Sequence, residues 1–177
     1  MMGNLSTRSI WTVILSASAI LMITMGVRQT AGLFVAPLDA ASGMGIVSIS
    51  FALAIGQFVW GLVQPIFGAI SDKRGSFAVL AFGAALLATG LALTPWLTTQ
   101  WGLVLTMGIL TAAGAGAGSF SILIGATAQQ LPAERRAFAA GFINAGGSFG
   151  QFLFAPLVQA IIGGFGWIAA LFTLAGS

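Results

Sequence analysis

Residues 77–97 read FAVLAFGAALLATGLALTPWL, a stretch of 21 residues without a charged side chain. An α-helix rises about 1.5 Å per residue, so a helix of this length spans the ~30 Å hydrocarbon core of a bilayer. The whole chain has the same character, since 58% of its 177 residues are hydrophobic and only 5% are charged. Soluble domains carry about 25% charged residues, and disordered chains combine low hydrophobicity with high charge. The composition therefore excludes both classes and predicts a membrane protein.

Apolar runs of similar length recur along the rest of the chain. Transmembrane β-strands would need segments of about 10 residues that alternate between apolar and polar side chains, and the sequence shows no such alternation. The predicted fold is an all-α, polytopic transmembrane helical bundle with five full spans and a sixth that is cut short. The predicted spans are residues 10–36, 45–70, 77–97, 102–128 and 137–162, with the partial sixth at 165–177.

Several classes of chemistry lack the residues they require. The chain contains no Cys, His or Tyr, which removes thiolate ligands and the commonest general base. Residues 146–150 fit the G-x-S-x-G pattern of a serine nucleophile, but no base is available, so glycines four residues apart are better explained by close helix packing. The net charge of +3 forms no basic stripe for nucleic acid. We expect no enzyme activity, no catalytic residues, no cofactor, no metal and no nucleic-acid partner.

Positive charge falls on one side of the predicted membrane. Outside the spans, basic residues occur at the N-terminus and in the connections after the second and fourth spans, and the other connections have none. Cytoplasmic connections are enriched in Lys and Arg, so the N-terminus is predicted to be cytoplasmic. The five residues are Arg8, Lys73, Arg74, Arg135 and Arg136.

Polar residues inside the spans share helix faces. In the second span Ser50, Gln57 and Gln64 recur every seven residues, and in the fifth Asn144 and Gln151 are also seven apart. Polar side chains are costly in lipid, so these faces are expected to point inward. The spacing leaves two explanations open, hydrogen bonds between helices or the lining of a water-filled cavity.

Arg28 lies inside the first span and is followed by Gln29. An unpaired charge at the bilayer centre costs at least ~2.5–3.5 kcal/mol on insertion scales. Three interpretations are open. The side chain could extend to the membrane surface, it could bind an anion through its planar guanidinium, or it could pair with Asp39, the only acid nearby.

Two stretches carry a resemblance to a known family. Residues 68–75, GAISDKRG, resemble the G-x-x-x-D-[RK]-x-G motif between the second and third helices of the major facilitator superfamily. Residues 26–38, GVRQTAGLFVAPL, resemble the first helix of oxalate/formate-antiporter-like and monocarboxylate-porter-like members. The motif implies that Asp72 holds helix ends together in one conformation, and its residues here are Gly68, Asp72, Lys73, Arg74 and Gly75.

The resemblance implies that residues 1–177 form the N-terminal six-helix half of a transporter in a bacterial-type inner membrane, whose C-terminal half is missing. Such a protein moves a small organic anion, here a monocarboxylate-like one, by symport or antiport through alternating access. The alternatives are a truncated or half-size membrane protein without transport activity, and a transporter of a different small solute. The expected substrate-binding residues are Arg28, Gln29, Gln57, Asn144 and Gln151.

The charge asymmetry generates a topology prediction. Because the chain lacks native Cys, single cysteines at Ser76 and Thr98 can be labelled in intact cells with a membrane-impermeant maleimide. We expect Thr98→Cys to react from outside and Ser76→Cys to react only after the membrane is opened. The reverse pattern would contradict a cytoplasmic N-terminus.

Overall fold

The structure is a computed structural model that describes residues 7–177. Its regular secondary structure over these residues is entirely helical. Five segments are long and apolar enough to cross a membrane, which confirms the predicted all-α polytopic bundle. They cover Ser9–Ser42, Ile46–Arg74, Ser76–Trp96, Gln100–Gln130 and Ala133–Phe165.

Three of the five segments combine shorter elements, and the third, Ser76–Trp96, joins α4 (Ser76–Leu93) to η2 (Thr94–Trp96). Span one contains α1 (Thr7–Thr30), the 3₁₀ turn η1 (Ala31–Phe34) and α2 (Val35–Ser42). Span four contains α5 (Gln100–Leu103), the π-helical segment η3 (Val104–Thr111), α6 (Ala112–Ala117) and α7 (Phe120–Gln130). The other elements are α3 (Ile46–Arg74), α4 (Ser76–Leu93), η2 (Thr94–Trp96), α8 (Ala133–Phe165) and α9 (Trp167–Ala175).

The helices extend further than hydropathy alone predicts. Residues 71–75 were expected to form a connection, but α3 continues through Arg74 and the chain reverses at Gly75, whose φ is +89°. Gly166, with φ +86°, makes the same one-residue turn between α8 and α9. Glycine adopts this left-handed region without steric cost. The charged residues 72–74 therefore lie in the last turn of α3, rather than in a separate loop.

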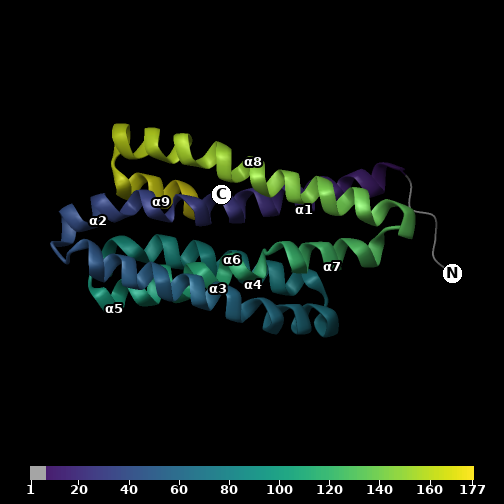
Figure 1. Cartoon of the computed structure of the whole chain (residues 1–177), viewed down its shortest axis with the longest axis horizontal. Coiled ribbons are helices and arrows are strands. Elements are labelled where there is room, and N and C mark those ends of the chain that lie inside the picture. The colour runs from purple at the N-terminus through teal and green to yellow at the C-terminus, as the bar shows by residue number, and fades with distance from the viewer. Residues whose placement is uncertain (1–6) are drawn as a thin grey trace.

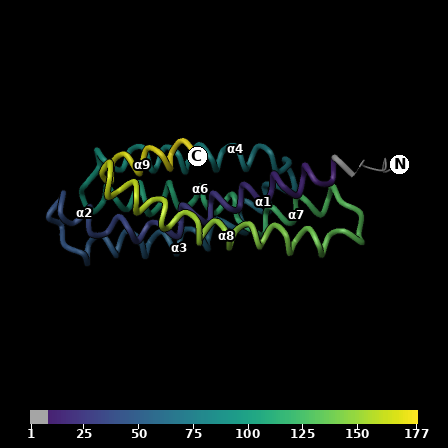
Figure 2. The backbone as a smooth tube through the Cα atoms, turned by 90° about the horizontal axis from the view of Figure 1, so that it is seen from above, coloured from purple at the N-terminus to yellow at the C-terminus, as the bar shows by residue number. Residues whose placement is uncertain are grey.

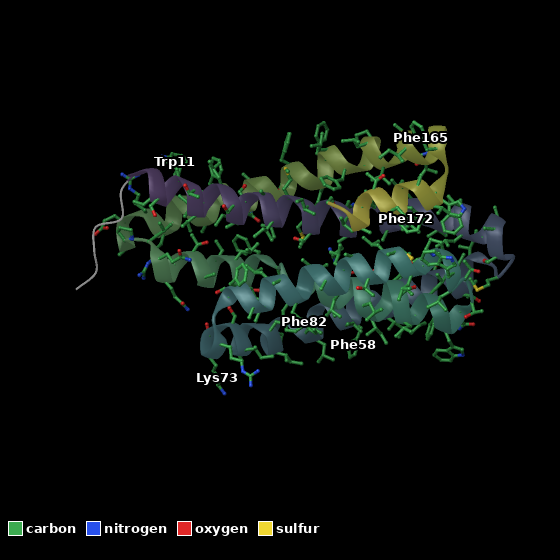
Figure 3. The ribbon with its side chains drawn as sticks, turned by 180° about the vertical axis from the view of Figure 1, so that it is seen from behind. Trp11, Phe58, Lys73, Phe82, Phe165 and Phe172 are labelled. Atoms are coloured by element: carbon green, nitrogen blue, oxygen red, sulfur yellow. The ribbon has the colours of Figure 1, made fainter. Side chains whose placement is uncertain are left out.

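The long helices run along one common axis (Figures 1 and 2). The first described residues and the α3–α4 and α7–α8 connections lie at the same end of the bundle (Figure 1). Trp11 and Lys73 lie toward this end in Figure 3, whereas Phe165 lies at the other. Lys73, Arg74, Arg135 and Arg136 thus belong to one end of the bundle. The connections at the opposite end contain no Lys or Arg.

Helices α1 and α8 pack through glycines. A Cβ built on Gly146 would overlap Ser18, and one built on Gly150 would overlap the Met22 carbonyl oxygen. Ser18 contacts Gly146, and Met22, four residues later, contacts Gly150, four residues later on α8. The two helices therefore run in parallel. Lipid gives helices no hydrophobic reason to associate, and small residues let their backbones approach. This confirms the packing role expected for residues 146–150.

Span four is interrupted near its middle, although the sequence predicted one continuous helix over residues 102–128. The break falls at Gly118 and Ser119, between α6 and α7. The Thr24 hydroxyl of α1 lies 3.1 Å from the Gly118 carbonyl oxygen and can donate to it. Irregular backbone at membrane depth is tolerated where protein groups satisfy it, and Thr24 does so here.

The packing of α1 on α8 predicts the effect of a side chain at Gly150. Gly150→Val would overpack the contact with Met22, and such substitutions typically cost about 1–3 kcal/mol. Gly141→Val is the matched control on the same helix, because nothing lies within 4 Å of a Cβ built there. We expect Gly150→Val alone to lower the unfolding midpoint in a detergent titration followed by circular dichroism. Equal midpoints for the two variants would contradict the proposed contact.

Candidate functional site

A cavity of about 320 Å³ lies between span one, α3 and the middle of span four. Most of its wall is apolar, with Phe34 from η1, Leu53 from α3 and Met107 from η3. Leu91 of α4 and Leu174 of α9 also reach it. The side chains in its lining that can form hydrogen bonds are Arg28, Gln29, Gln57, Trp60 and Thr111.

Arg28 is held in this cavity by two side chains of α3. Its Nη2 donates to Gln57 Oε1, and its Cζ lies 4.0 Å from the centroid of the Trp60 ring. Gln57 and Trp60 are three residues apart and therefore lie on the same helix face. A cation within about 6 Å of an aromatic centroid is attracted by the ring quadrupole. The guanidinium is thus fixed by one hydrogen bond and one stacking contact.

The surroundings of Arg28 bear on its three interpretations. Among residues 7–177 it forms no ion pair, and Asp39 Oδ1 instead accepts the Gly45 N–H at 2.9 Å. The guanidinium is half-buried and lines a cavity that is open to the outside of the bundle, where Gln29 and Gln57 are exposed. It has five N–H donors, of which Gln57 engages one, and no other described residue accepts from it. The guanidinium therefore keeps N–H donors that no described residue engages.

The cavity brings together three of the five predicted binding residues, Arg28, Gln29 and Gln57. Asn144 and Gln151 of α8 do not line it. Gly146 packs against Ser18, and Gly150 packs against Met22. At 1.5 Å per residue, Ser18 and Met22 lie about 15 Å and 9 Å from Arg28 along the axis of α1. Asn144 is exposed and Gln151 half-buried on α8, so in this chain they are separate from the cavity.

Two of the lining side chains that can form hydrogen bonds, Trp60 and Thr111, were not among the predicted binding residues. Trp60 could have been found, because it follows Gln57 by one helical turn on the same face. Thr111 could not, because its place depends on the π-helical turn of η3, where its hydroxyl donates to the Thr106 carbonyl at 2.9 Å. Single π turns inside helices occur frequently at functional sites. Here the π-helical segment contributes Met107 and Thr111 to the cavity wall.

A second cavity of about 610 Å³ lies between the end of α3 and α7. The Ser121 hydroxyl donates across it to Gln64 Oε1 at 3.2 Å. Asp72, from the predicted motif, lines this cavity and is exposed, as are Lys73 and Arg74. The structure gives Asp72 no hydrogen bond or ion pair with any residue of the described range.

One face of α3 connects the two cavities. Leu53, Gln57 and Trp60 line the first, and Gln64, Gly68 and Ser71 line the second. Their spacing of three or four residues places them on a single stripe. Both explanations left open for the polar face therefore apply, because Gln64 bonds Ser121 and also lines a cavity.

This geometry defines a class of protein. Helices long and apolar enough to cross a membrane enclose a mostly apolar cavity that holds one cation, and no group of His, Cys, Asp or Glu in residues 7–177 could hold a metal. Such a cavity suits the binding of a small solute inside a multi-pass membrane protein.

Comparison with known proteins gives the family. The sequence model of the Major Facilitator Superfamily matches residues 5–177, and the chain belongs to this superfamily of transporters. It is 30% identical over 161 residues to rat (Rattus norvegicus) monocarboxylate transporter 13, covering 91% of this chain and 37% of that protein.

Two further relatives are more distant. Monocarboxylate transporter 12 of Homo sapiens is 26% identical over 94% of this chain and 32% of its own length. The oxalate:formate antiporter of Oxalobacter formigenes is 28% identical over 86% of this chain and 36% of its own length. The chain spans about a third of the length of these relatives. The comparisons thus show the superfamily and an integral, multi-pass membrane protein.

Proposed function

We propose that this chain is the N-terminal half of a secondary transporter that carries a small, monocarboxylate-like anion by alternating access. The observation that carries the proposal is the Arg28 guanidinium, half-buried in the first cavity and held there by Gln57 and Trp60. The relatives named as monocarboxylate transporters and as an oxalate:formate antiporter support the same solute class. In this family the substrate lies near the membrane midplane, between two halves that move about it.

The composition of the cavity supports a singly charged substrate. Among residues 7–177, Arg28 is the only charged residue in its lining, and a guanidinium gains most from an anion that meets its planar fork. Phe34, Leu53 and Met107 supply an apolar wall for a short hydrocarbon group. Gln29 and Gln57 add polar contacts beside the carboxylate.

The proposed mechanism also uses the second cavity and the other half of the protein. Asp72 ends α3 beside this cavity, and its partner would be a helix end of the C-terminal half in one conformation only. Asn144 and Gln151, which do not line the first cavity, would contact substrate from α8 only in another arrangement of the halves. The end that carries Lys73 and Arg135 is proposed to be cytoplasmic, in a bacterial-type inner membrane.

Two alternatives predict different results. A truncated or half-size protein would have no second group of six spans, and a transporter of another solute would bind no carboxylate. The mass of the protein expressed from the native locus and the reading frame after Ser177 distinguish a half-size protein from a two-half transporter. We expect a continuous frame that encodes six further spans.

The anion role of Arg28 predicts a graded series. In proteoliposomes that contain the intact protein, Arg28→Gln should weaken carboxylate binding about 10- to 100-fold, because hydrogen bonds to charged groups contribute about 1.5–3 kcal/mol. Arg28→Lys should recover only part, since an ammonium lacks the planar fork. Arg135→Gln, at an exposed arginine near the start of α8, is the control. Equal affinities in all four proteins would refute the role of Arg28.

The motif at the end of α3 predicts a different kinetic effect. If Asp72 holds helix ends together and does not contact substrate, Asp72→Asn should slow turnover in the intact protein and leave equilibrium affinity unchanged. Glu134→Gln, an exposed acid at the start of α8, is the matched control and should change neither. Loss of binding at normal protein levels would count against this role.

A further inference from the structure

We infer that Trp60 is the positioning residue of the proposed anion site, and that its ring face sets the orientation of the Arg28 guanidinium. This inference rests on the function proposed above. It adds a residue that orients the Arg28 guanidinium, and it gives Gln57 and Trp60 of α3 different roles. Gln57 holds one edge of the guanidinium by a hydrogen bond, and Trp60 holds one face by stacking.

Both constraints are needed to fix a planar group. A single hydrogen bond to Nη2 leaves the guanidinium free to rotate about that contact, and a long arginine side chain has many rotamers to populate. The Trp60 ring, whose centroid lies 4.0 Å from Arg28 Cζ, restricts the tilt of the guanidinium plane. The edges that Gln57 does not engage then present their N–H groups in a fixed direction, and a carboxylate can bind without first ordering the cation.

The place of Trp60 is itself set by close packing between α3 and α6. A Cβ built on Gly116 would overlap the Val63 side chain and lie 3.3 Å from the Trp60 carbonyl oxygen and 3.8 Å from its Cδ1. The same carbonyl oxygen accepts Gln64 Nε2 at 3.3 Å. Gly116 therefore lets α6 approach α3 beside the ring. The tryptophan is held by its backbone and by its neighbours on both helices.

The indole N–H of Trp60 takes no part in this contact. Nε1 is buried and has no hydrogen-bond partner among residues 7–177. A buried donor without an acceptor is unfavourable, so the N–H adds a cost to the conformation described here. The useful part of the side chain is its aromatic face. Trp60→Phe retains an aromatic face and Trp60→Leu does not, so the two variants are expected to differ in their effect on Arg28.

The test is a double-mutant cycle in the purified intact protein, with acetate, propionate and oxalate as titrated probes. Trp60→Leu should weaken binding of the best probe about 2- to 30-fold, the range expected for loss of a cation–π contact. Trp60→Phe should lose clearly less. In the Arg28→Gln background Trp60→Leu should have no further effect. Trp101→Leu, at an exposed tryptophan of α5, is the control for loss of an indole.

A second measurement needs no substrate. The ultraviolet resonance Raman difference between the parent protein and Trp60→Phe isolates the Trp60 signal, and Arg28→Gln should shift that signal if the guanidinium stacks on the ring. An unshifted signal, or equal effects of Trp60→Leu in both Arg28 backgrounds, would overturn the inference. If the parent protein binds none of the probes, the proposed function fails, and the Raman comparison still decides whether Trp60 holds Arg28.

Discussion

A guanidinium inside a bundle of apolar helices is the constraint on which the rest of this structure depends. An unpaired charge in hydrocarbon is expensive, and Arg28 has no acidic partner in the described range. Stacking on Trp60 and bonding to Gln57 lower that cost. Neither contact neutralises the charge, which is the basis of the anion site proposed above. In that proposal the mostly apolar wall strengthens the attraction between the cation and its ligand, because the attraction grows as the local dielectric constant falls.

The bundle that encloses Arg28 is held together by close backbone contact rather than by hydrophobic contrast. Lipid offers helices as apolar an environment as their own interfaces, so small residues and interhelical hydrogen bonds determine the packing. Gly150 brings α8 against α1. Gly108 and Gly116 bring span four against α3, on either side of the cavity. A larger side chain at these positions would move the helices that carry Arg28, Gln57 and Trp60.

The fold class could be predicted from the sequence because hydropathy in a membrane protein follows from one requirement, the satisfaction of every backbone group in lipid. The ends of helices could not be predicted, because charged residues such as Asp72 and Arg74 continue α3 past the end of its apolar run. The break at Gly118 and the π turn of η3 also escaped prediction. Both lie against tertiary partners, Thr24 of α1 at the break and Gly90 of α4, which packs against Thr106 and Thr111, at the π turn. Arg28 and Gln57 were predicted from the cost of polar groups in lipid, and both line the first cavity. Asn144 does not line it, because helical periodicity predicts the face of a helix on which a residue lies and not its position along the helix axis.

The central claim is that the binding site for a carboxylate lies beside Arg28 and Trp60. It can be tested directly by crystallising the intact protein with 3-bromopropionate and locating the bromine by anomalous scattering. The account predicts one peak in the cavity lined by Arg28, Phe34 and Trp60, with the carboxylate against the guanidinium. A peak confined to the second cavity beside Asp72, or one on the lipid-facing surface alone, would contradict it.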